Sequence, residues 1–437
     1  MSRGLASRPV QTANIMRLDH KGRGEADVPG RAARVHHTLP GEQVTFKRRR
    51  RRRGFDEAEI VELLRPSAHR VEPRCPHFGN CGGCSMQHID PGQQIALKQG
   101  WYREMLAGYE LEPERWLEPL SGPQWAYRRR ARLGVKKVAG KGRVLVGFRE
   151  VFKSFVADMD GCEILSGNVG QLIAPLCQLI DGLSICERIP QIEVAVADNA
   201  TALVLRVLDT PTADDLEALR QFAGCHQVRF YLQEGGLDSV QPLIEGQDAL
   251  CYRLPAFDLE LEFSPVDFIQ VNGALNEKMI ELAIELLAPR DDEQVLDLFC
   301  GLGNFSLALA RRCAGVTGIE GDMGLVERAH GNAIRNNIDN AEFLPADLFF
   351  PSAEEPWMTG RYPCVVLDPP RSGASQVIPF LPSVGAQRIV YVSCNPASLA
   401  RDAASLVELG YDFKATGVMD MFPHTSHAEA IALFARP

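Results

Sequence analysis

The spacing of apolar residues is most regular in the last third of the chain. From about residue 265, short apolar runs, such as residues 295–299, 364–367 and 389–392, alternate with segments in which apolar residues recur at helical spacing. This alternation predicts a parallel sheet with helices on both faces, the doubly wound α/β class. Residues 413–418 and 430–434 are expected to close this sheet as a hairpin.

The earlier part of the chain has the pattern of strands joined by turns. Between residues 15 and 64, short β-type segments are separated by glycine and proline turns, which is typical of a small β-barrel. Apolar and polar residues alternate in much of 190–265, which predicts a mostly antiparallel sheet with one helix at about 212–223. We therefore predict a barrel over 10–68, a mostly β central domain over 69–264 and an α/β domain over 265–437.

The composition is that of a soluble globular protein, with 45% hydrophobic and 24% charged residues in a chain of 437. No segment has the apolar length of a signal sequence or a membrane span, so we expect a cytoplasmic protein, a monomer, with no membrane partner. The 12 cysteines of such a protein are expected to be reduced, catalytic or metal-bound rather than paired in disulfides.

Positive charge is concentrated in two regions of a chain whose net charge is −9. Residues 1–54 contain 14 lysines and arginines against 4 acidic residues, and residues 127–153 contain 10 against 1. Such regions favour a polyanionic partner, nucleic acid in particular, over a solvated surface. Residues 47–53 are seven basic residues in a row, which form either a flexible loop between strands or a contact with phosphates.

Three cysteines lie close together in the motif Cys75-x5-Cys81-Gly82-Gly83-Cys84. The glycines allow the backbone to bend, so the sulfurs are expected to share a soft metal ion or a cluster.

A fourth ligand has to come from elsewhere in the chain. Cys162 is favoured for this role, with Cys177 and Cys186 as competitors. Four thiolates suit either zinc or an iron–sulfur cluster, and a ligand role for His77 or His88 would favour zinc. The spacing alone does not choose between the two metals.

A glycine turn follows the first strand of the predicted α/β domain. Residues 297–305 read D-x-F-x-G-x-G-x-F, and the next strand ends at Glu320. Glycines let a ligand approach the backbone, and a carboxylate at the end of the second strand is placed for ribose hydroxyls. A nucleoside cofactor is therefore favoured over a tight turn without a ligand. Asp347, after the third strand, is a candidate for the adenine edge, and Asp368 begins D-P-P-R after the fourth.

Cys394 lies where a strand is followed by a helix. Asn395 is suited to the N-cap of that helix and Pro396 to its first position. The dipole and the unpaired N–H groups of a helix start favour a thiolate, whereas a lone cysteine is more often a small buried side chain. Because the carboxyl ends of parallel strands share one edge of the sheet, Cys394 should lie beside the glycine turn and its acids. This convergence predicts that Cys394 is a nucleophile.

Four motifs in order, D-x-F-x-G-x-G-x-F, D-P-P-R, V-S-C-N-P and M-F-P-H-T-x-H-x-E, resemble those of the RNA uracil-C5 methyltransferases. The resemblance covers nearly the whole chain and implies a Rossmann-like class I methyltransferase domain that uses S-adenosylmethionine. It implies that the N-terminal barrel is an OB-like TRAM domain that binds RNA. It also implies that the central domain carries a [4Fe-4S] cluster, as in a branch of the family that methylates 23S rRNA.

The same resemblance gives roles to individual residues. It implies that Cys394 is the nucleophile and Glu429 the base. The residues that would contact the cofactor are Gln270, Phe299, Asn304, Glu320, Asp347 and Asp368. The residues that would hold the cluster are Cys75, Cys81, Cys84 and Cys162.

The chemistry explains why such an enzyme needs a cysteine, because uracil C5 is too weak a nucleophile to take a methyl group directly. A thiolate added at C6 makes C5 nucleophilic, and a base must afterwards remove the C5 proton. His424 and His427 are alternatives to Glu429 for this base. The alternative functions are methylation of another rRNA or tRNA uridine, methylation of an amino group, and RNA binding by a cluster-containing protein without activity.

Overall fold

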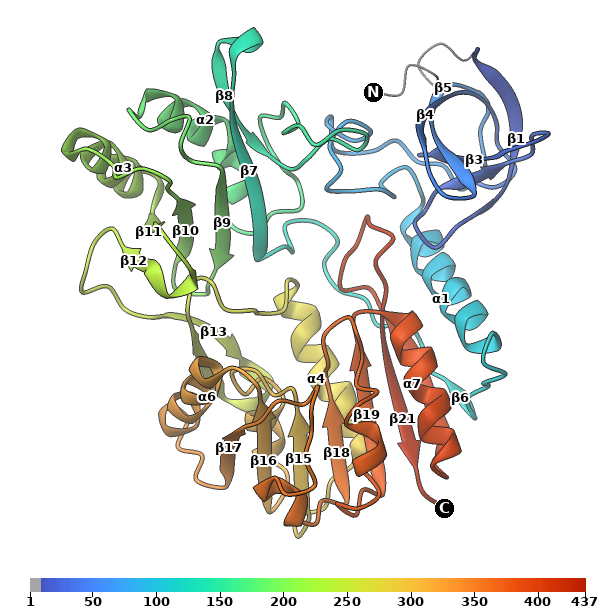
Figure 1. The fold of residues 1–437 in the computed structure, drawn as a ribbon, viewed down its shortest axis with the longest axis vertical. Coiled ribbons are helices and arrows are strands. Elements are labelled where there is room, and N and C mark those ends of the chain that lie inside the picture. The colour runs from blue at the N-terminus through green and yellow to red at the C-terminus, as the bar shows by residue number, and fades with distance from the viewer. Residues whose placement is uncertain (1–8) are drawn as a thin grey trace.

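The computed structural model of the chain describes residues 9–437 (Figure 1). Within these residues it contains a closed barrel, a six-stranded sheet, a two-stranded hairpin and an eight-stranded sheet. In Figure 1 the barrel lies at the upper right, the six-stranded sheet at the upper left and the eight-stranded sheet below both. The predicted combination of a small barrel with an α/β fold is confirmed.

Five short strands form the barrel. They are β1 (Gln11–Leu18), β2 (Gly24–Ala26), β3 (Ala32–His36), β4 (Gln43–Arg51) and β5 (Phe55–Arg65), closed in the order β1-β2-β3-β5-β4. Buried and exposed residues alternate along most of β4, so every second side chain enters the barrel. The interior is filled by apolar side chains such as Val35, Val44 and Phe46, all fully buried.

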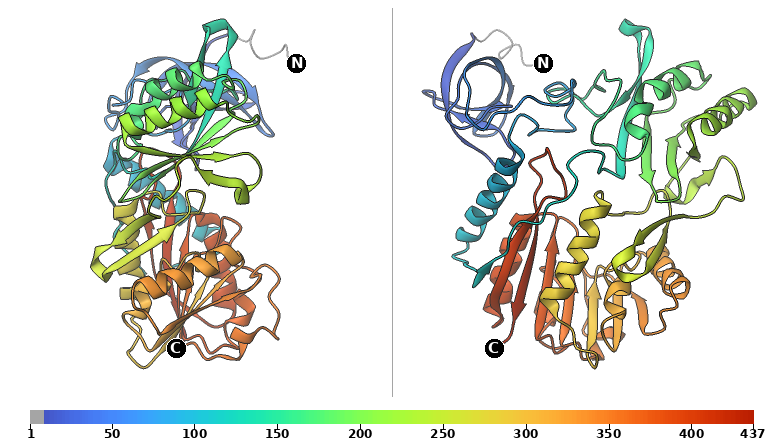
Figure 2. Two further views of the ribbon diagram at one scale, coloured as in Figure 1. Left: turned by 90° about the vertical axis from the view of Figure 1, so that its left-hand side faces the viewer. Right: turned by 180° about the vertical axis from the view of Figure 1, so that it is seen from behind.

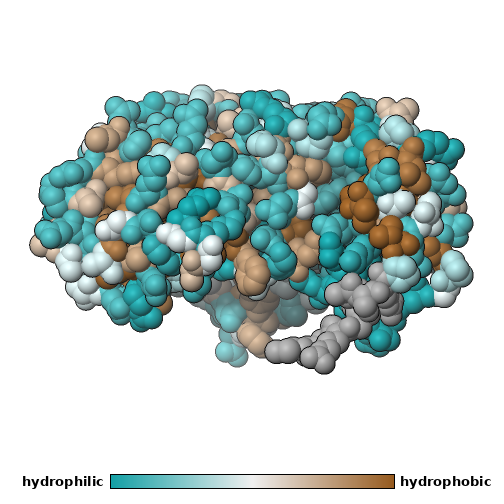
Figure 3. All heavy atoms as spheres, turned by 90° about the horizontal axis from the view of Figure 1, so that it is seen from above, coloured by the Kyte–Doolittle hydropathy of each residue, from teal (hydrophilic) through white to brown (hydrophobic). Residues whose placement is uncertain are grey.

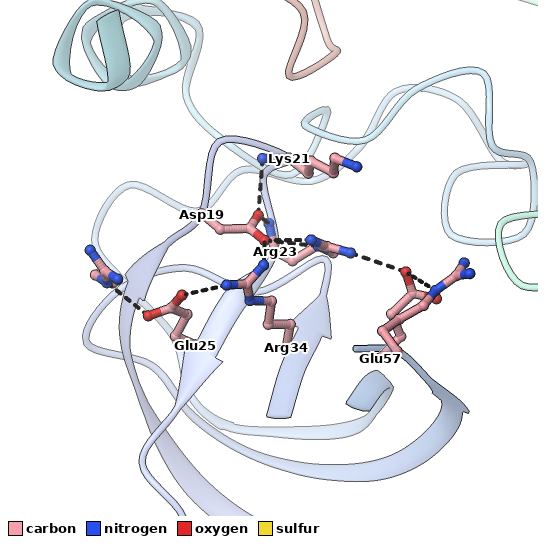
Figure 4. Close-up of polar contacts among 8 residues, drawn as sticks. Asp19, Lys21, Arg23, Glu25, Arg34 and Glu57 are labelled. Carbon is pink, nitrogen blue, oxygen red and sulfur yellow. Dashed lines mark hydrogen bonds and ion pairs between the residues drawn. The ribbon is translucent and has the colours of Figure 1, made fainter. Parts of the chain in front are cut away.

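The run of basic residues at 47–53 is not a flexible loop, because most of it lies in β4 and pairs with β5. Acidic residues of the barrel balance part of its charge, as in the ion pair of Arg48 with Asp56 at 3.0 Å. Arg23 likewise joins Asp19, at 2.7 Å, to Glu57, at 3.0 Å (Figure 4). The positive charge that the sequence concentrates here is thus partly neutralised inside the barrel.

The central sheet is antiparallel apart from one pair of strands. Its strands are β7 (Arg130–Val138), β8 (Arg143–Gly147), β9 (Gln191–Val196), β10 (Thr201–Arg206), β11 (Val228–Gln233) and β12 (Val240–Pro242). Their order is β12-β11-β10-β9-β7-β8, and only β10 and β11 are parallel. The predicted helix is α3 (Ala213–His226), whereas the apolar pattern does not predict the second helix, α2 (Ile173–Gly182).

The eight-stranded sheet is doubly wound, as predicted. Its strands are β6 (Arg115–Trp116), β15 (Gln294–Leu298), β16 (Gly315–Glu320), β17 (Ala341–Pro345), β18 (Cys364–Leu367), β19 (Arg388–Ser393), β20 (Asp412–Met419) and β21 (Glu429–Ala435). The helices beside it are α1 (Pro91–Ala107), α4 (Gly273–Leu287), α5 (Ser306–Ala310), α6 (Met323–Arg335) and α7 (Pro396–Glu408). Alternate residues of the strands enter two cores: Val390 and Val392 pack in the core that contains α4, and Ile389 and Tyr391 in the core that contains α1 and α7.

The strand order places a ligand site in the middle of this sheet. The order is β17-β16-β15-β18-β19-β21-β20-β6, with β15 to β19 parallel and β21 antiparallel between β19 and β20. The chain therefore reverses direction across the sheet between β15 and β18. Open α/β sheets bind ligands at the carboxyl ends of the strands at such a switch point.

Two elements that precede the central sheet pack against the α/β domain. Helix α1 lies against α7, and β6 extends the eight-stranded sheet beyond β20 (Figure 2). The hairpin of β13 (Leu250–Leu254) and β14 (Leu259–Phe263) also shares a core with α4 and α6. Parts of residues 69–264 therefore pack with the α/β fold, because the apolar face of a helix or hairpin is buried against a neighbouring apolar surface.

The large apolar side chains fill continuous cores in the barrel and on the faces of the two sheets. Hydrophilic residues predominate on the face shown in Figure 3, with hydrophobic residues interspersed among them. In residues 9–437 no helix has both the length and the apolar content needed to cross a membrane.

Candidate active site

Cys394 lies between β19 and helix α7, at the carboxyl edge of the eight-stranded sheet. Asn395 occupies the predicted N-cap position, but its side chain does not cap the helix. Its Nδ2 donates instead to the carbonyl oxygen of Arg371 at 2.9 Å. This bond joins the cysteine turn to the D-P-P-R segment that follows the neighbouring strand, β18.

The strand register brings Glu429 beside Cys394. Strands β19 and β21 are antiparallel, and Ser393 lies opposite Ala430, so the next residues along are Cys394 and Glu429. On the other side of β19, the parallel strand β18 is followed by Asp368. The predicted nucleophile, the predicted base and one predicted cofactor acid therefore lie at one edge of the sheet.

Burial keeps the thiol of Cys394 protonated in the free protein. The burial of this side chain, with the nearby carboxyl groups of Glu429 and Asp368, raises the pKa of Cys394 to about 11. Arg371 acts in the opposite direction. The prediction that the helix N-terminus favours a thiolate is therefore wrong for the free protein, because burial and two acids outweigh the dipole.

Glu429 holds its proton more tightly than an ordinary glutamate. Its side chain is 4% exposed, and burial, reinforced by Asp368, raises its pKa to about 8, while Lys98 lowers it. A carboxyl group with a pKa in this range exchanges its proton near neutral pH, as a catalytic base must. A solvated glutamate at the start of a strand would show neither feature.

The two histidines of the same loop have different surroundings. His424 is buried, with its ring centroid 4.0 Å from that of Trp125, and burial lowers its pKa to about 4. His427 is exposed and lines a cavity together with Cys394. Neither histidine lies opposite Cys394 in the sheet register.

The glycine turn after β15 leaves bare backbone at the same edge. Phe299, Gly301 and Gly303 have positive φ angles of 67°, 56° and 96°. A side chain at Gly301 would meet no atom within 4 Å, so this backbone is open to a ligand. Glu320, the last residue of β16, accepts a hydrogen bond from the Gly301 N–H at 3.1 Å. Bare backbone beside a carboxylate is what a nucleoside cofactor requires.

The other residues assigned to the cofactor differ in their environment. The side-chain oxygen of Asn304 accepts hydrogen bonds from Tyr252 and Asn276, both at 2.9 Å. Its amide is thus engaged in holding the glycine turn against β13 and α4. Asp347 is exposed after β17, and Gln270 is half-buried shortly before α4.

Carboxyl groups are crowded beneath the glycine turn. Asp297 is fully buried; one of its oxygens accepts from the Ser306 hydroxyl, and the other has no hydrogen-bond partner among residues 9–437. Burial raises the pKa of both Asp297 and Asp368 to about 7, and Asp297 contributes to the shift of Asp368. A positively charged ligand would relieve this crowding, and S-adenosylmethionine carries positive charge on its sulfonium.

A cavity of about 420 Å³ lies over Cys394 and is lined by more than the predicted motifs. The barrel contributes His20 and Lys21, and α1 contributes Lys98 and Trp101. In Figure 4 the side chain of Lys21 points away from the ion pairs of the barrel. The sequence pattern did not identify these residues as part of the site. The one feature that could have indicated Lys98 is a charged residue on the buried face of α1, which consists of Gln94, Lys98, Trp101, Tyr102 and Leu106.

The four cysteines predicted to bind a metal group line one pocket. They are Cys75, Cys81 and Cys84, from the loop before α1, and Cys162, from the loop after β8. A Cβ at Gly83 would lie 2.9 Å from the ring of Phe148, so only glycine fits there. Burial raises the pKa of Cys81 to about 11 and that of Cys84 to about 12, and neighbouring thiols add to both shifts.

The competing metal ligands lie outside this pocket. Cys177 is buried in the core of the central sheet, and Cys186 packs against that core. Neither His77 nor His88 lines the cysteine pocket. In the described residues, 9–437, no group of three or more His, Cys, Asp or Glu side chains that could hold a metal ion is found. Of the predicted metal ligands and their competitors, Cys75, Cys81, Cys84 and Cys162 therefore share the pocket.

The cysteine loop is bonded to the loop that carries the last motif. Ser85 and Met86, just after Cys84, donate their backbone N–H groups to the carbonyl oxygen of His424, both at 2.9 Å. The N–H of Ser426 donates to the Ser85 hydroxyl at 3.1 Å. In Figure 1 the loop between β20 and β21 rises toward the segment before α1. The cysteine pocket and the Cys394 edge are therefore parts of one hydrogen-bonded structure.

Known proteins resemble this chain over nearly its whole length. The model of the tRNA (uracil-5-)-methyltransferase family matches residues 120–355 and 358–436. A protein of Alkalilimnicola ehrlichii named 23S rRNA (uracil(1939)-C(5))-methyltransferase RlmD is 49% identical over 99% of this chain and 98% of its own length. A protein of the same name from Nitrosococcus oceani is 49% identical over 98% of this chain and 96% of its own length.

A solved structure shares the fold. The Pyrococcus abyssi tRNA (uracil-54, C5)-methyltransferase, in complex with S-adenosyl-L-homocysteine, aligns with a TM-score of 0.77 and 23% identity. The alignment covers 97% of this chain and 99% of that chain. The resemblance drawn from the four motifs is confirmed by the family match and by the near-full-length relatives. The chain belongs to the tRNA (uracil-5-)-methyltransferase family.

Proposed function

We propose that the protein methylates C5 of uridine 1939 in 23S rRNA, with S-adenosylmethionine as the methyl donor. The observation that supports the chemistry is the register of β19 with β21, in which Cys394, the proposed nucleophile, and Glu429, the proposed base, are neighbours. Cys394 also lines the cavity described above. The choice of nucleotide rests on the similarity to proteins named for uracil 1939 over nearly their whole length.

The glycine turn and the acids around it fit S-adenosylmethionine, which supplies a methyl group when bound. The crowded carboxyl groups of Asp297 and Asp368 favour a ligand with positive charge. In this proposal Glu320 would contact the ribose hydroxyls and Asp347 the adenine edge. The residues that would hold the cofactor are Gln270, Phe299, Glu320, Asp347 and Asp368, and Asn304 would hold the turn in place.

Cys394 provides the nucleophile. Its sulfur adds to C6 of the uracil ring, and the electrons of the C5–C6 double bond make C5 nucleophilic toward the methyl group. Because the thiol is protonated in the free protein, its proton has to pass to solvent water as the RNA enters and the thiolate forms. Arg371 lines the same cavity, and its positive charge favours the thiolate. The target base must leave its stack to reach this cavity.

Glu429 removes the proton that remains on C5 after methyl transfer. The carboxylate takes the proton, the electron pair of the C5–H bond restores the C5–C6 double bond, and the C6–S bond breaks. The sulfur leaves as the thiolate of Cys394, and the methylated RNA is released.

Mapping of methylated uridines tests the proposed target. We expect 5-methyluridine at position 1939 of 23S rRNA in cells that make the protein and its absence in cells that lack it. The wild-type chain should restore the modification to the deficient cells, and the Cys394→Ala variant should not. Loss of a methylated uridine from tRNA, with 23S rRNA unchanged, would contradict the target but not the chemistry.

We also propose that Cys75, Cys81, Cys84 and Cys162 hold a [4Fe-4S] cluster. The four thiols line one pocket. Burial raises the pKa of Cys81 and Cys84, whereas a bound metal cation would lower the pKa of its thiol ligands and hold them as thiolates. Four cysteine ligands are the set that a [4Fe-4S] cluster takes.

Iron analysis tests the cluster. Anaerobically purified protein is expected to be brown and to contain about four irons per chain. Cys162→Ser should lose the iron, whereas Cys177→Ser, the matched change of a cysteine outside the pocket, should keep it. Zinc without iron in the wild-type protein would contradict the cluster, and full iron content in Cys162→Ser would place the fourth ligand elsewhere.

The three parts of the chain have distinct proposed roles. The barrel, over 10–68, is proposed to be a TRAM-like module that binds RNA, since His20 and Lys21 line the cavity over Cys394. The central domain, over 69–264, would carry the cluster, and the domain over 265–437, completed by α1 and β6, would carry out methyl transfer. We propose that the protein acts in the cytoplasm as a monomer.

A further inference from the structure

Helix α1 brings a fully buried lysine to the catalytic edge. Lys98 is 0% exposed, and its Nζ donates to the Asp420 carboxylate at 2.6 Å and to the Phe422 carbonyl oxygen at 3.0 Å. A buried ammonium group is strongly unfavourable unless such partners compensate it. Lysine has three protons to donate, and these two acceptors, within residues 9–437, leave one N–H for another group.

The position of Lys98 relates it to Glu429. Asp420 follows Met419, the last residue of β20, and Met419 lies opposite Glu429 in the register of β20 with β21. Asp420, which holds Lys98, is therefore the residue next to Met419, the residue that faces Glu429 across the two strands. Lys98 is also one of the residues that line the cavity over Cys394, which the uracil must enter.

Glu429 is surrounded by charged and titratable groups from every neighbouring element. These are Asp368 after β18, Cys394 after β19, Asp420 after β20, Lys98 on α1, and Arg371 and His427 in the cavity wall. Burial and Asp368 both favour the protonated form of Glu429, whereas Lys98 favours the carboxylate. Lys98 is thus the cation that opposes protonation of the base.

We propose that Lys98 is a positioning residue for proton removal: its buried ammonium group, held by Asp420, stabilises the carboxylate form of Glu429, which takes the C5 proton. This role rests on the proposed function and gives α1, a helix that precedes the central sheet, a part in the chemistry. Lys98 keeps its own protons throughout. The C5 proton goes to an oxygen of Glu429, the C5–H electron pair restores the double bond, and Cys394 leaves as the thiolate.

The pH dependence of C5 proton release tests this role in the full-length, anaerobically purified protein. An RNA fragment with tritium at C5 of the target uridine reports proton removal, and denaturing gels report the covalent adduct. Lys98→Met should raise the pH midpoint of release by about one unit, which is about tenfold slower release at neutral pH. The adduct should accumulate there and resolve at high pH.

Two further variants separate charge from structure. Lys98→Gln removes the charge but keeps a hydrogen-bond donor for Asp420, and it should raise the midpoint as Lys98→Met does. Lys98→Arg keeps the charge and should stay close to wild type. If Lys98→Met loses S-adenosylmethionine binding and so is misfolded, the midpoint of Lys98→Gln tests the role of the charge. Unchanged midpoints in Lys98→Met and Lys98→Gln, or a shift in Lys98→Arg as large as that in Lys98→Met, would overturn the role of Lys98. A wild-type protein that releases no tritium from C5 would instead reject the proposed function.

Discussion

Replacement of Cys394 by alanine is expected to abolish methylation and to leave no covalent band between protein and RNA. Without the sulfur nothing adds to C6, so C5 is never activated, and the rate should fall roughly 10⁴-fold or more, as it does when an enzyme loses its nucleophile. Binding of S-adenosylmethionine should persist, because the glycine turn follows another strand, β15. Transfer of a labelled methyl group and denaturing gels measure the two losses.

The matched control for this change is Cys225→Ala. Cys225 is exposed on α3 of the central domain and lines neither the cysteine pocket nor the cavity over Cys394. This variant should methylate RNA at the wild-type rate. An adduct formed by Cys394→Ala would mean that another residue attacks C6.

Replacement of Glu429 by glutamine is expected to trap the protein on its methylated product. Cys394 can still add to C6 and the methyl group can still be transferred, but an amide cannot accept the C5 proton. The C6–S bond therefore remains, and denaturing gels should show a band that contains protein, RNA and the labelled methyl group. Turnover should fall by about 10²–10⁴-fold, the usual effect of losing a general base. Glu408→Gln, at an exposed position of α7, is the matched control.

The pH dependence of product release gives the same base a second test. Because the pKa of Glu429 is raised to about 8 in the free protein, most of this carboxyl group is protonated at neutral pH and cannot accept a proton. Release by the wild-type protein should therefore accelerate as the pH rises through about 8. Normal turnover by Glu429→Gln, with no trapped band, would exclude Glu429 and make His427 the next candidate.

The catalytic edge could be predicted from the sequence because its parts obey local rules. A short apolar run becomes a buried strand, and the residue after each parallel strand lies at the same edge of the sheet. These rules place Asp368 after β18 and Cys394 after β19. The open turn at Gly301 and Gly303 could also be predicted from the local sequence, since both residues adopt the positive φ that glycine permits.

The features that the sequence did not reveal depend on contacts between distant segments. Lys98 and Asp420 are 322 positions apart, and no local pattern joins them. The thiol of Cys394 is protonated because Glu429 and other distant groups pack around it, whereas the local sequence shows only a helix start. The basic run of the barrel is balanced by acids that meet it only when β5 pairs with β4.

The segment that contains the six-stranded sheet begins and ends at adjacent points, where it joins the rest of the protein. The N–H of Arg129 donates to the carbonyl oxygen of Val271 at 2.8 Å, and Arg128 and Asn272 form a β-bridge. Since β6 joins the eight-stranded sheet before this point, residues 129–271 are an insertion between β6 and the other strands of that sheet. An insertion with adjacent ends can be gained or exchanged with little disturbance to its host. Cys162 lies inside the insertion, and the three other proposed cluster ligands lie outside it. The proposed cluster would therefore link the insertion to the rest of the protein and prevent such an exchange.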